Sequence, residues 1–216
     1  MSTIQSTRKI GFRQITINDI PQSASLVAKS FSKFDPPAVA LNLTMQDFEK
    51  FITAMLNDHK IQKLTTVAID PKNNEIVGVL ISETFGTDIH IEKSLLEKFG
   101  PIFQFLEELE KPYIDDIDVK TSIHQLMLAT KTEMFGQGIA TSLVLANNQA
   151  ATQQGYKFAY TDATGIASQH IFKTKMNYDL LDSKVYSTFK FMGCPVFKSV
   201  LEPQACLLLK KRLIKC

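Results

Sequence analysis

The spacing of apolar residues switches along the chain between the period of a strand and that of a helix. Residues 12–17 (FRQITI) alternate and predict a first strand. Apolar side chains from Ile20 to Phe31 then recur on one side of a helix that Asn18 or Asp19 can cap. This helix must end near Asp35, because the following prolines restrict the residue before them. Thr44, with Asp47 three residues later, forms a variant capping box and predicts a second helix.

The rest of the chain predicts a hairpin followed by alternating strands and helices. The predicted strands are Leu64–Ile69, Glu75–Glu83, Ser122–Ala129, Lys157–Asp162, Leu181–Phe189 and Ala205–Ile214; the predicted helices are Lys93–Phe105, interrupted near Gly100 and Pro101, Gly138–Gln154 and Ser168–Thr174. Strand, helix and strand from residue 122 onward imply at least one right-handed parallel crossover. The early hairpin makes the sheet mixed, so the expected fold is a mixed α/β sheet flanked by helices.

Composition narrows the class of protein. The 216 residues are 44% hydrophobic and 21% charged, which is ordinary for one globular domain. The net charge is +2 and no basic stripe is visible, so nucleic acid is not an expected partner. The apolar runs are too short to span a membrane, residues 1–11 carry no secretory signal, and three cysteines form no disulfide framework. We therefore expect a cytoplasmic protein with no membrane partner.

The stretch from Phe135 to Thr141, FGQGIAT, is the most informative motif. It follows a predicted strand and opens a predicted helix. Glycines let a backbone approach a ligand closely, and the first N–H groups of a helix attract phosphate. The stretch lacks the Lys-Ser/Thr of a nucleotide-hydrolysing loop and does not follow a first strand as a dinucleotide fingerprint does. A tight turn that needs glycine for packing alone is the other interpretation.

The second half of the chain resembles the GNAT N-acetyltransferase superfamily, whose loop reads Arg/Gln-x-x-Gly-x-Gly/Ala. Gly138 and Ala140 match its last two positions, whereas Phe135 stands where Arg or Gln is usual. The resemblance implies a GNAT domain over residues 11–216 after a flexible N-terminus, residues 1–10. It also implies that acetyl-CoA is the co-substrate. The residues implied to bind it are Leu126, Met127 and Leu128 through their backbone, and Phe135, Gly136, Gln137, Gly138, Ile139, Ala140 and Thr141.

Three segments are similar to the arylalkylamine N-acetyltransferase branch of that superfamily. They are residues 124–128 (HQLML), residues 163–172 (ATGIASQHIF) and residues 34–37 (FDPP). The resemblance implies that Asp35 is a catalytic base, although the position is usually Glu. His124 is the second candidate base, and Ser168 is a candidate donor to the leaving sulfur. Phe172 stands where many members carry a tyrosine acid, which excludes that acid here.

The expected activity is transfer of acetyl from acetyl-CoA to a small primary amine, with arylalkylamines as the leading acceptor class. A polyamine, an amino acid or a peptide amine is the alternative acceptor, and a non-catalytic CoA-binding domain is the alternative function. No metal is expected, and the protein would be a monomer or homodimer. The acidic run from Glu107 to Asp118 is typical of a solvated surface, although it could also attract a cationic amine.

Overall fold

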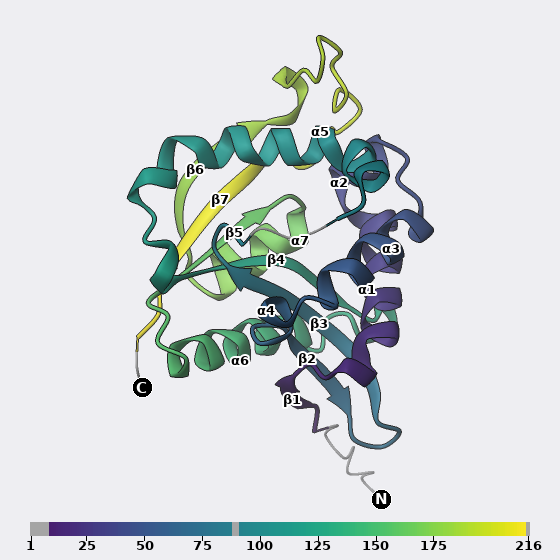
Figure 1. Ribbon diagram of the computed structural model, residues 1–216, viewed down its shortest axis with the longest axis vertical. Coiled ribbons are helices and arrows are strands. Elements are labelled where there is room, and N and C mark those ends of the chain that lie inside the picture. The colour runs from purple at the N-terminus through teal and green to yellow at the C-terminus, as the bar shows by residue number, and fades with distance from the viewer. Residues whose placement is uncertain (1–8, 88–90, 215–216) are drawn as a thin grey trace, which may run out of the picture.

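A computed structural model describes residues 9–87 and 91–214; the greater part of the expected N-terminal tail lies outside these residues. One mixed sheet runs through the described chain, in the strand order β1-β2-β3-β4-β5-β7-β6 (Figure 1). Its strands are β1 (Gly11–Gln14), β2 (Thr66–Asp70), β3 (Glu75–Thr84), β4 (Ser122–Thr130), β5 (Phe158–Ala163), β6 (Asp179–Val185) and β7 (Ala205–Arg212). Strands β4 and β5 are parallel and all other neighbours are antiparallel, which confirms the mixed sheet.

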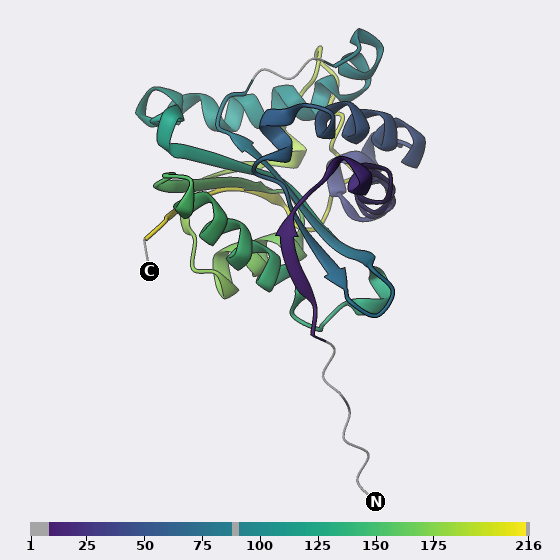
Figure 2. The same cartoon turned by 60° about the horizontal axis from the view of Figure 1, so that its bottom comes forward.

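Helices cover both faces of the sheet. They are α1 (Ile20–Phe34), α2 (Pro36–Ala40), α3 (Met45–Leu56), α4 (His59–Gln62), α5 (Lys93–Glu110), α6 (Ile139–Gln153) and α7 (Ile166–Gln169). In Figure 2, α1 and α3 lie on one side of the sheet and α6 on the other. Each face has its own apolar layer, since Val79 and Ile81 of β3 pack in one cluster and Val77 and Leu80 in another. No helix of the described residues is long and apolar enough to cross a membrane.

The sheet opens between its two parallel strands. Residues 122–124 of β4 pair with residues 158–160 of β5, and the two strands separate beyond these pairs. A bulge in β4 leaves Leu126 without an opposite residue, because Ile81 of β3 pairs with Met127 and Ser82 pairs with Gln125. The hydroxyl of Thr161 donates to the Gln125 carbonyl at 2.8 Å and bridges the start of the gap. The β4 backbone from Leu126 onward therefore faces the gap without a β5 partner.

Several predicted boundaries are confirmed. Helix α1 ends at Phe34, directly before Asp35, and α3 begins after Thr44 with the predicted Thr44–Asp47 capping box. The hairpin of β2 and β3 is present, and α6 forms the crossover between the parallel strands.

The predicted interruption of the helix at Gly100 and Pro101 is wrong. Helix α5 continues through Pro101 to Glu110. A proline inside a helix costs about 3 kcal/mol. Burial of one large apolar side chain contributes roughly 1.5–3 kcal/mol, and five buried apolar side chains line α5: Leu95, Phe99, Ile102, Phe105 and Leu109. Tertiary packing therefore outweighs the local penalty.

Two other predicted elements have different bounds in the structure. The strand predicted to reach Phe189 ends at Val185 and passes into a 3-10 turn, where the Tyr186 hydroxyl donates to the Thr164 carbonyl at 2.8 Å. The helix predicted to start at Ser168 begins at Ile166, and it widens into a π-helical stretch from His170 to Lys175. Ser168 is consequently inside the first turn and not at its start.

Candidate active site

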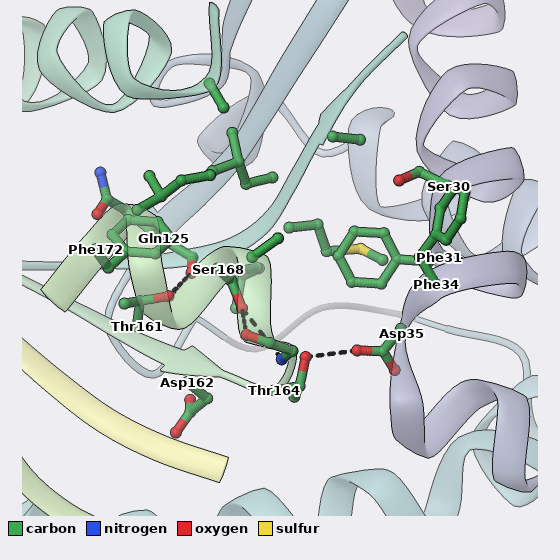
Figure 3. A pocket seen from close by; sticks show the side chains of 18 of the residues that line it. Ser30, Phe31, Phe34, Asp35, Gln125, Thr161, Asp162, Thr164, Ser168 and Phe172 are labelled. Atoms are coloured by element: carbon green, nitrogen blue, oxygen red, sulfur yellow. Dashed lines mark hydrogen bonds between the residues drawn. The ribbon is translucent and has the colours of Figure 1, made fainter. Parts of the chain in front are cut away.

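A cavity of about 1030 Å³ lies at the gap between β4 and β5 (Figure 3). Its wall combines α1, α3, α5, β4, the loop before α6 and the first turn after β5. The predicted residues that line it are Asp35, His124, Leu126, Met127, Leu128, Phe135, Gly136, Gly138, Ile139, Ala140, Thr141 and Ser168. The structure thus brings the three candidate catalytic residues and the glycine motif to one cavity. Gln137 is the exception, since it does not line the wall.

The glycine motif forms the turn into α6. Gly136 has a φ of +77° and Gly138, the N-cap of α6, has a φ of +76°. A Cβ at either position would meet no atom within 4 Å, so these glycines are required by backbone conformation and not by crowding. The first N–H groups of α6 have no acceptor within the helix and lie at its positive end, which suits a phosphate group.

Phe135 gives the loop an apolar surface where the resemblance leads one to expect Arg or Gln. Its side chain is 55% exposed and its ring lies 6.1 Å from that of Phe34, measured between centroids. The groups that this turn offers to a phosphate are therefore backbone N–H groups and the positive end of the helix dipole.

The unpaired part of β4 can bind an extended chain. The backbone of Leu126 to Leu128 faces the gap, and a ligand with amide groups can pair there as an added strand does. The Met127 side chain is buried in the core, as expected. The loop and this strand place a helix N-terminus suited to phosphate and an unpaired strand edge in one cavity.

Asp35 is buried at the end of α1 and caps α2. Its Oδ2 accepts from the Ala38 N–H at 3.1 Å, and its Oδ1 accepts from the Thr164 hydroxyl at 2.5 Å (Figure 3). Burial raises the pKa of Asp35 to about 6, while the two hydrogen bonds act to lower it. At neutral pH the group is largely ionised and is a stronger base than an exposed aspartate.

His124 is surrounded by carboxylates. Its Nε2 lies 2.8 Å from Oδ2 of Asp162 and 3.8 Å from Oε1 of Glu110, and Phe85 stacks on its ring. Glu83 stands opposite His124 in the register of β3 and β4. We call Glu83, Glu110 and Asp162 the carboxylate cluster. Burial raises the pKa of Glu83 to about 7 and of Glu110 to about 8, and the His124 ring opposes both shifts.

The ligand atoms of Glu110, His124 and Asp162 lie within 4.8 Å of one another, so they could also hold a divalent ion. The interpretation of the acidic run as a solvated surface is wrong for Glu110, whose side chain is only 16% exposed and lines the cavity.

Ser168 belongs to a capping box. Its hydroxyl donates to the Gly165 carbonyl at 2.9 Å and accepts from the Gly165 N–H at 3.2 Å. Phe172 is buried against Tyr178, whose hydroxyl donates to Oε1 of Gln125 at 2.7 Å. The side chain at the usual tyrosine position therefore packs in the core.

Sequence reasoning gave no role to Thr164, Asp162 or Glu83, and it considered Glu110 only as part of an acidic run that could attract a cationic amine. Thr164 lies in the ATG segment quoted above. Asp162 stands two residues before it, and this spacing could have indicated that the two side chains share one face of a strand. No local pattern placed Glu83 or Glu110 beside His124, because only the tertiary fold brings β3 and α5 to that residue.

No protein-family model matches the chain. Its fold is similar to that of arylalkylamine N-acetyltransferase 2 from Aedes aegypti, with 22% identity over 95% of this chain and 99% of that chain and a TM-score of 0.78. The C-terminal condensation domain of Ebony, solved in complex with beta-alanyl-dopamine, has a TM-score of 0.82 at 16% identity, covering 94% of this chain and 99% of that one.

A polyamine N-acetyltransferase from Drosophila melanogaster has a TM-score of 0.69 at 14% identity, covering 95% of this chain and 100% of that one. These likenesses extend over nearly the whole of each chain. The chain therefore has the fold of the GNAT N-acetyltransferases, which confirms the fold expected from the sequence.

Proposed function

We propose that this chain transfers acetyl from acetyl-CoA to a small primary amine by direct attack in a ternary complex. One observation carries the proposal: the helix N-terminus suited to phosphate and a buried, ionisable Asp35 line the same cavity. A donor bound by the loop and along β4 would present its acyl end near the gap, within the cavity that Asp35 also lines.

Acetyl-CoA supplies an activated acyl group with a thiolate as leaving group. The chain must orient both substrates, which lowers the entropic part of the barrier, and must remove a proton from the acceptor ammonium. Asp35 is the base that we favour, because its carboxylate lines the cavity and is held by two hydrogen bonds. His124 is the alternative base, and its Nε2 is engaged by Asp162.

We assign Ser168 a secondary role as a donor to the leaving sulfur. Its hydroxyl lines the cavity but donates to the Gly165 carbonyl, so it must rotate before it can serve the sulfur.

Two parts of the wall support different acceptors. Phenylalanine rings from α1, α3 and α5 favour an arylalkylamine: Phe31, Phe48, Phe51, Phe99 and Phe103. The carboxylate cluster favours a polyamine as the second candidate. The relatives whose names specify an arylalkylamine or a polyamine are consistent with either.

The first test is release of thiol from acetyl-CoA with arylalkylamines, polyamines, amino acids and a lysine peptide as acceptors. We expect turnover with a small amine and a fall of about 100-fold or more in kcat for Asp35→Asn, since a general base contributes 10²–10⁴-fold. If His124→Ala shows a fall of that size and Asp35→Asn does not, His124 is the base. CoA binding without turnover of any amine would support the non-catalytic alternative.

A further inference from the structure

The wall of the cavity is strongly acidic although the whole chain carries a net charge of +2. Among the described residues that line it, one lysine, Lys175, stands against six carboxyl groups: Asp35, Glu83, Glu107, Glu110, Asp162 and Glu202. Such a surface attracts cations and repels anions. One ammonium group bound near Asp35 would leave most of these carboxyl groups without a cationic partner.

The carboxylate cluster is the most deeply buried part of that acidic wall. Glu83 is 6% exposed, and the side chains of Asp162 and Glu110 are 4% and 16% exposed. Among the described residues, no lysine or arginine forms an ion pair with any of the three. Of the residues that the structure describes, His124 is the one basic group in an ion pair with the cluster, and the pKa values of Glu83 and Glu110 stay raised by burial although the ring opposes the shift.

Two oxygens of the cluster have no hydrogen-bond donor. They are Oδ1 of Asp162 and Oε2 of Glu83, both buried among the described residues. A buried carboxylate oxygen without a donor is unfavourable, and an N–H group of a bound ligand would remove the penalty. Both side chains line the cavity, but the two oxygens are closed to solvent, so a ligand reaches them only when the side chains turn toward it.

The cluster and the candidate base Asp35 line the same cavity. Asp162 lies in β5 and Thr164 directly follows that strand, where its hydroxyl donates to the Asp35 carboxylate (Figure 3). Because Asp162 and Asp35 line the same cavity, an acceptor with a cationic group at each end can contact both.

We propose that the carboxylate cluster and His124 form a subsite for the second cationic group of an elongated acceptor, an α,ω-diamine or an amino-guanidine. The reacting amine of the same acceptor lies at Asp35. An ammonium or guanidinium group supplies several N–H donors, which the unpartnered oxygens of Asp162 and Glu83 accept. The inference rests on the proposed function and selects the second acceptor class over the arylalkylamines.

The test compares 1,5-diaminopentane with pentylamine, which has the same chain length and one charge. We expect kcat/KM to be at least tenfold higher for the diamine. In Glu110→Gln and Glu83→Gln, the ratio of the two values should fall at least fivefold. Glu97→Gln, an exposed position on the same helix, is the matched control and should leave the ratio unchanged.

Equal kcat/KM for both amines, or a ratio unaffected by the cluster variants, would overturn the subsite while leaving acetyl transfer intact. Calorimetric titration of the diamine into the protein without acetyl-CoA tests binding separately from catalysis. Binding that is lost in Glu110→Gln supports the subsite even if another acyl donor is used. Tight binding of Zn²⁺ or Mn²⁺ that requires His124, together with no binding of the diamine, would overturn the proposal. The cluster would then be a metal site and not an ammonium site.

Discussion

At the scale of single residues, the site contains buried carboxyl groups whose ionisation destabilises the folded state. The pKa of Asp35 is raised from 3.8 to about 6, so the folded state holds its proton more tightly than the unfolded chain does. Its ionisation therefore lowers the free energy of unfolding as the pH rises from about 4 to 6. A group that destabilises the fold at neutral pH and lines a cavity is a candidate for function.

Thr164→Val should change the pH dependence of the reaction. The Thr164 hydroxyl stabilises the ionised form of Asp35, so its loss raises the pKa of that carboxyl further. The acidic limb of kcat/KM should move to higher pH, with a fall of roughly two- to fourfold at pH 7. Thr164→Ser should restore the wild-type profile. An unchanged acidic limb in the valine variant would show that Asp35 is not the titrating base.

At the scale of elements, the position of the first turns of α6 depends on its close packing against β3. Gly78 of β3 faces this helix, and a Cβ there would lie 2.7 Å from Cδ1 of Leu143 and 3.3 Å from Cγ2 of Ile139. Here glycine is needed for space, whereas Gly136 and Gly138 are needed for conformation. The contact fixes the first turn of α6, and with it the proposed phosphate site, against the sheet.

Gly78→Val should lower the free energy of unfolding by about 1–3 kcal/mol, because extra methyl groups in a packed interface force neighbours to move. The affinity for CoA should fall as well, since Ile139 belongs to the first turn of α6. Gly100→Ala is the matched control: its Cβ would lie 3.6 Å from Phe191, an ordinary contact, and should stabilise α5 by roughly 0.5–1 kcal/mol. Denaturant unfolding and CoA titration measure both effects. Unchanged CoA affinity in Gly78→Val would show that CoA binding does not depend on how α6 packs against β3.

Gly138→Asp should abolish measurable CoA binding, because it adds a negative charge and a strained φ where the pyrophosphate would lie. Gly155, at the other end of α6, also has a positive φ, +94°. Gly155→Ala should therefore lose about 1 kcal/mol of stability with no change in CoA affinity. Retained CoA binding in Gly138→Asp would mean that the loop is a turn and nothing more.

At the scale of the whole molecule, the cavity lies where the two halves of the sheet separate. The β1-to-β4 half and the half formed by β5, β7 and β6 are joined by three residue pairs of β4 and β5. A buried hydrogen-bond network reinforces this connection between the halves. In it, Gln125 Nε2 donates to Asn147 at 2.7 Å and the Tyr178 hydroxyl donates to Gln125. A ligand that fills the gap would contact both halves.

Acetyl-CoA at about 100 times its Kd should stabilise the fold by about 2.7 kcal/mol, since it binds the folded state alone. For a domain of this size the melting temperature should rise by roughly 5–10 °C in one calorimetric transition. The rise should be absent in Gly138→Asp. Two separate transitions, one of them unaffected by the ligand, would show that the halves do not unfold together.

Local patterns in the sequence determined most elements and part of the site. The capping box at Thr44, the prolines after Asp35 and the glycines before α6 each act within a few residues, so the chain reveals them directly. The GNAT fold was expected because the glycine loop and the segments 34–37, 124–128 and 163–172 resemble that superfamily.

Only the tertiary structure decided how far α5 extends and what surrounds His124. Packing of the apolar side of α5 overrides the local effect of Pro101 and carries Glu110 into the cavity. Glu83, His124 and Asp162 lie on three different strands, and Asp35 meets Thr164 across 129 positions of the chain. Such contacts depend on how sheet and helices pack, and burial then sets the pKa values of the site; neither is encoded in any local pattern of residues.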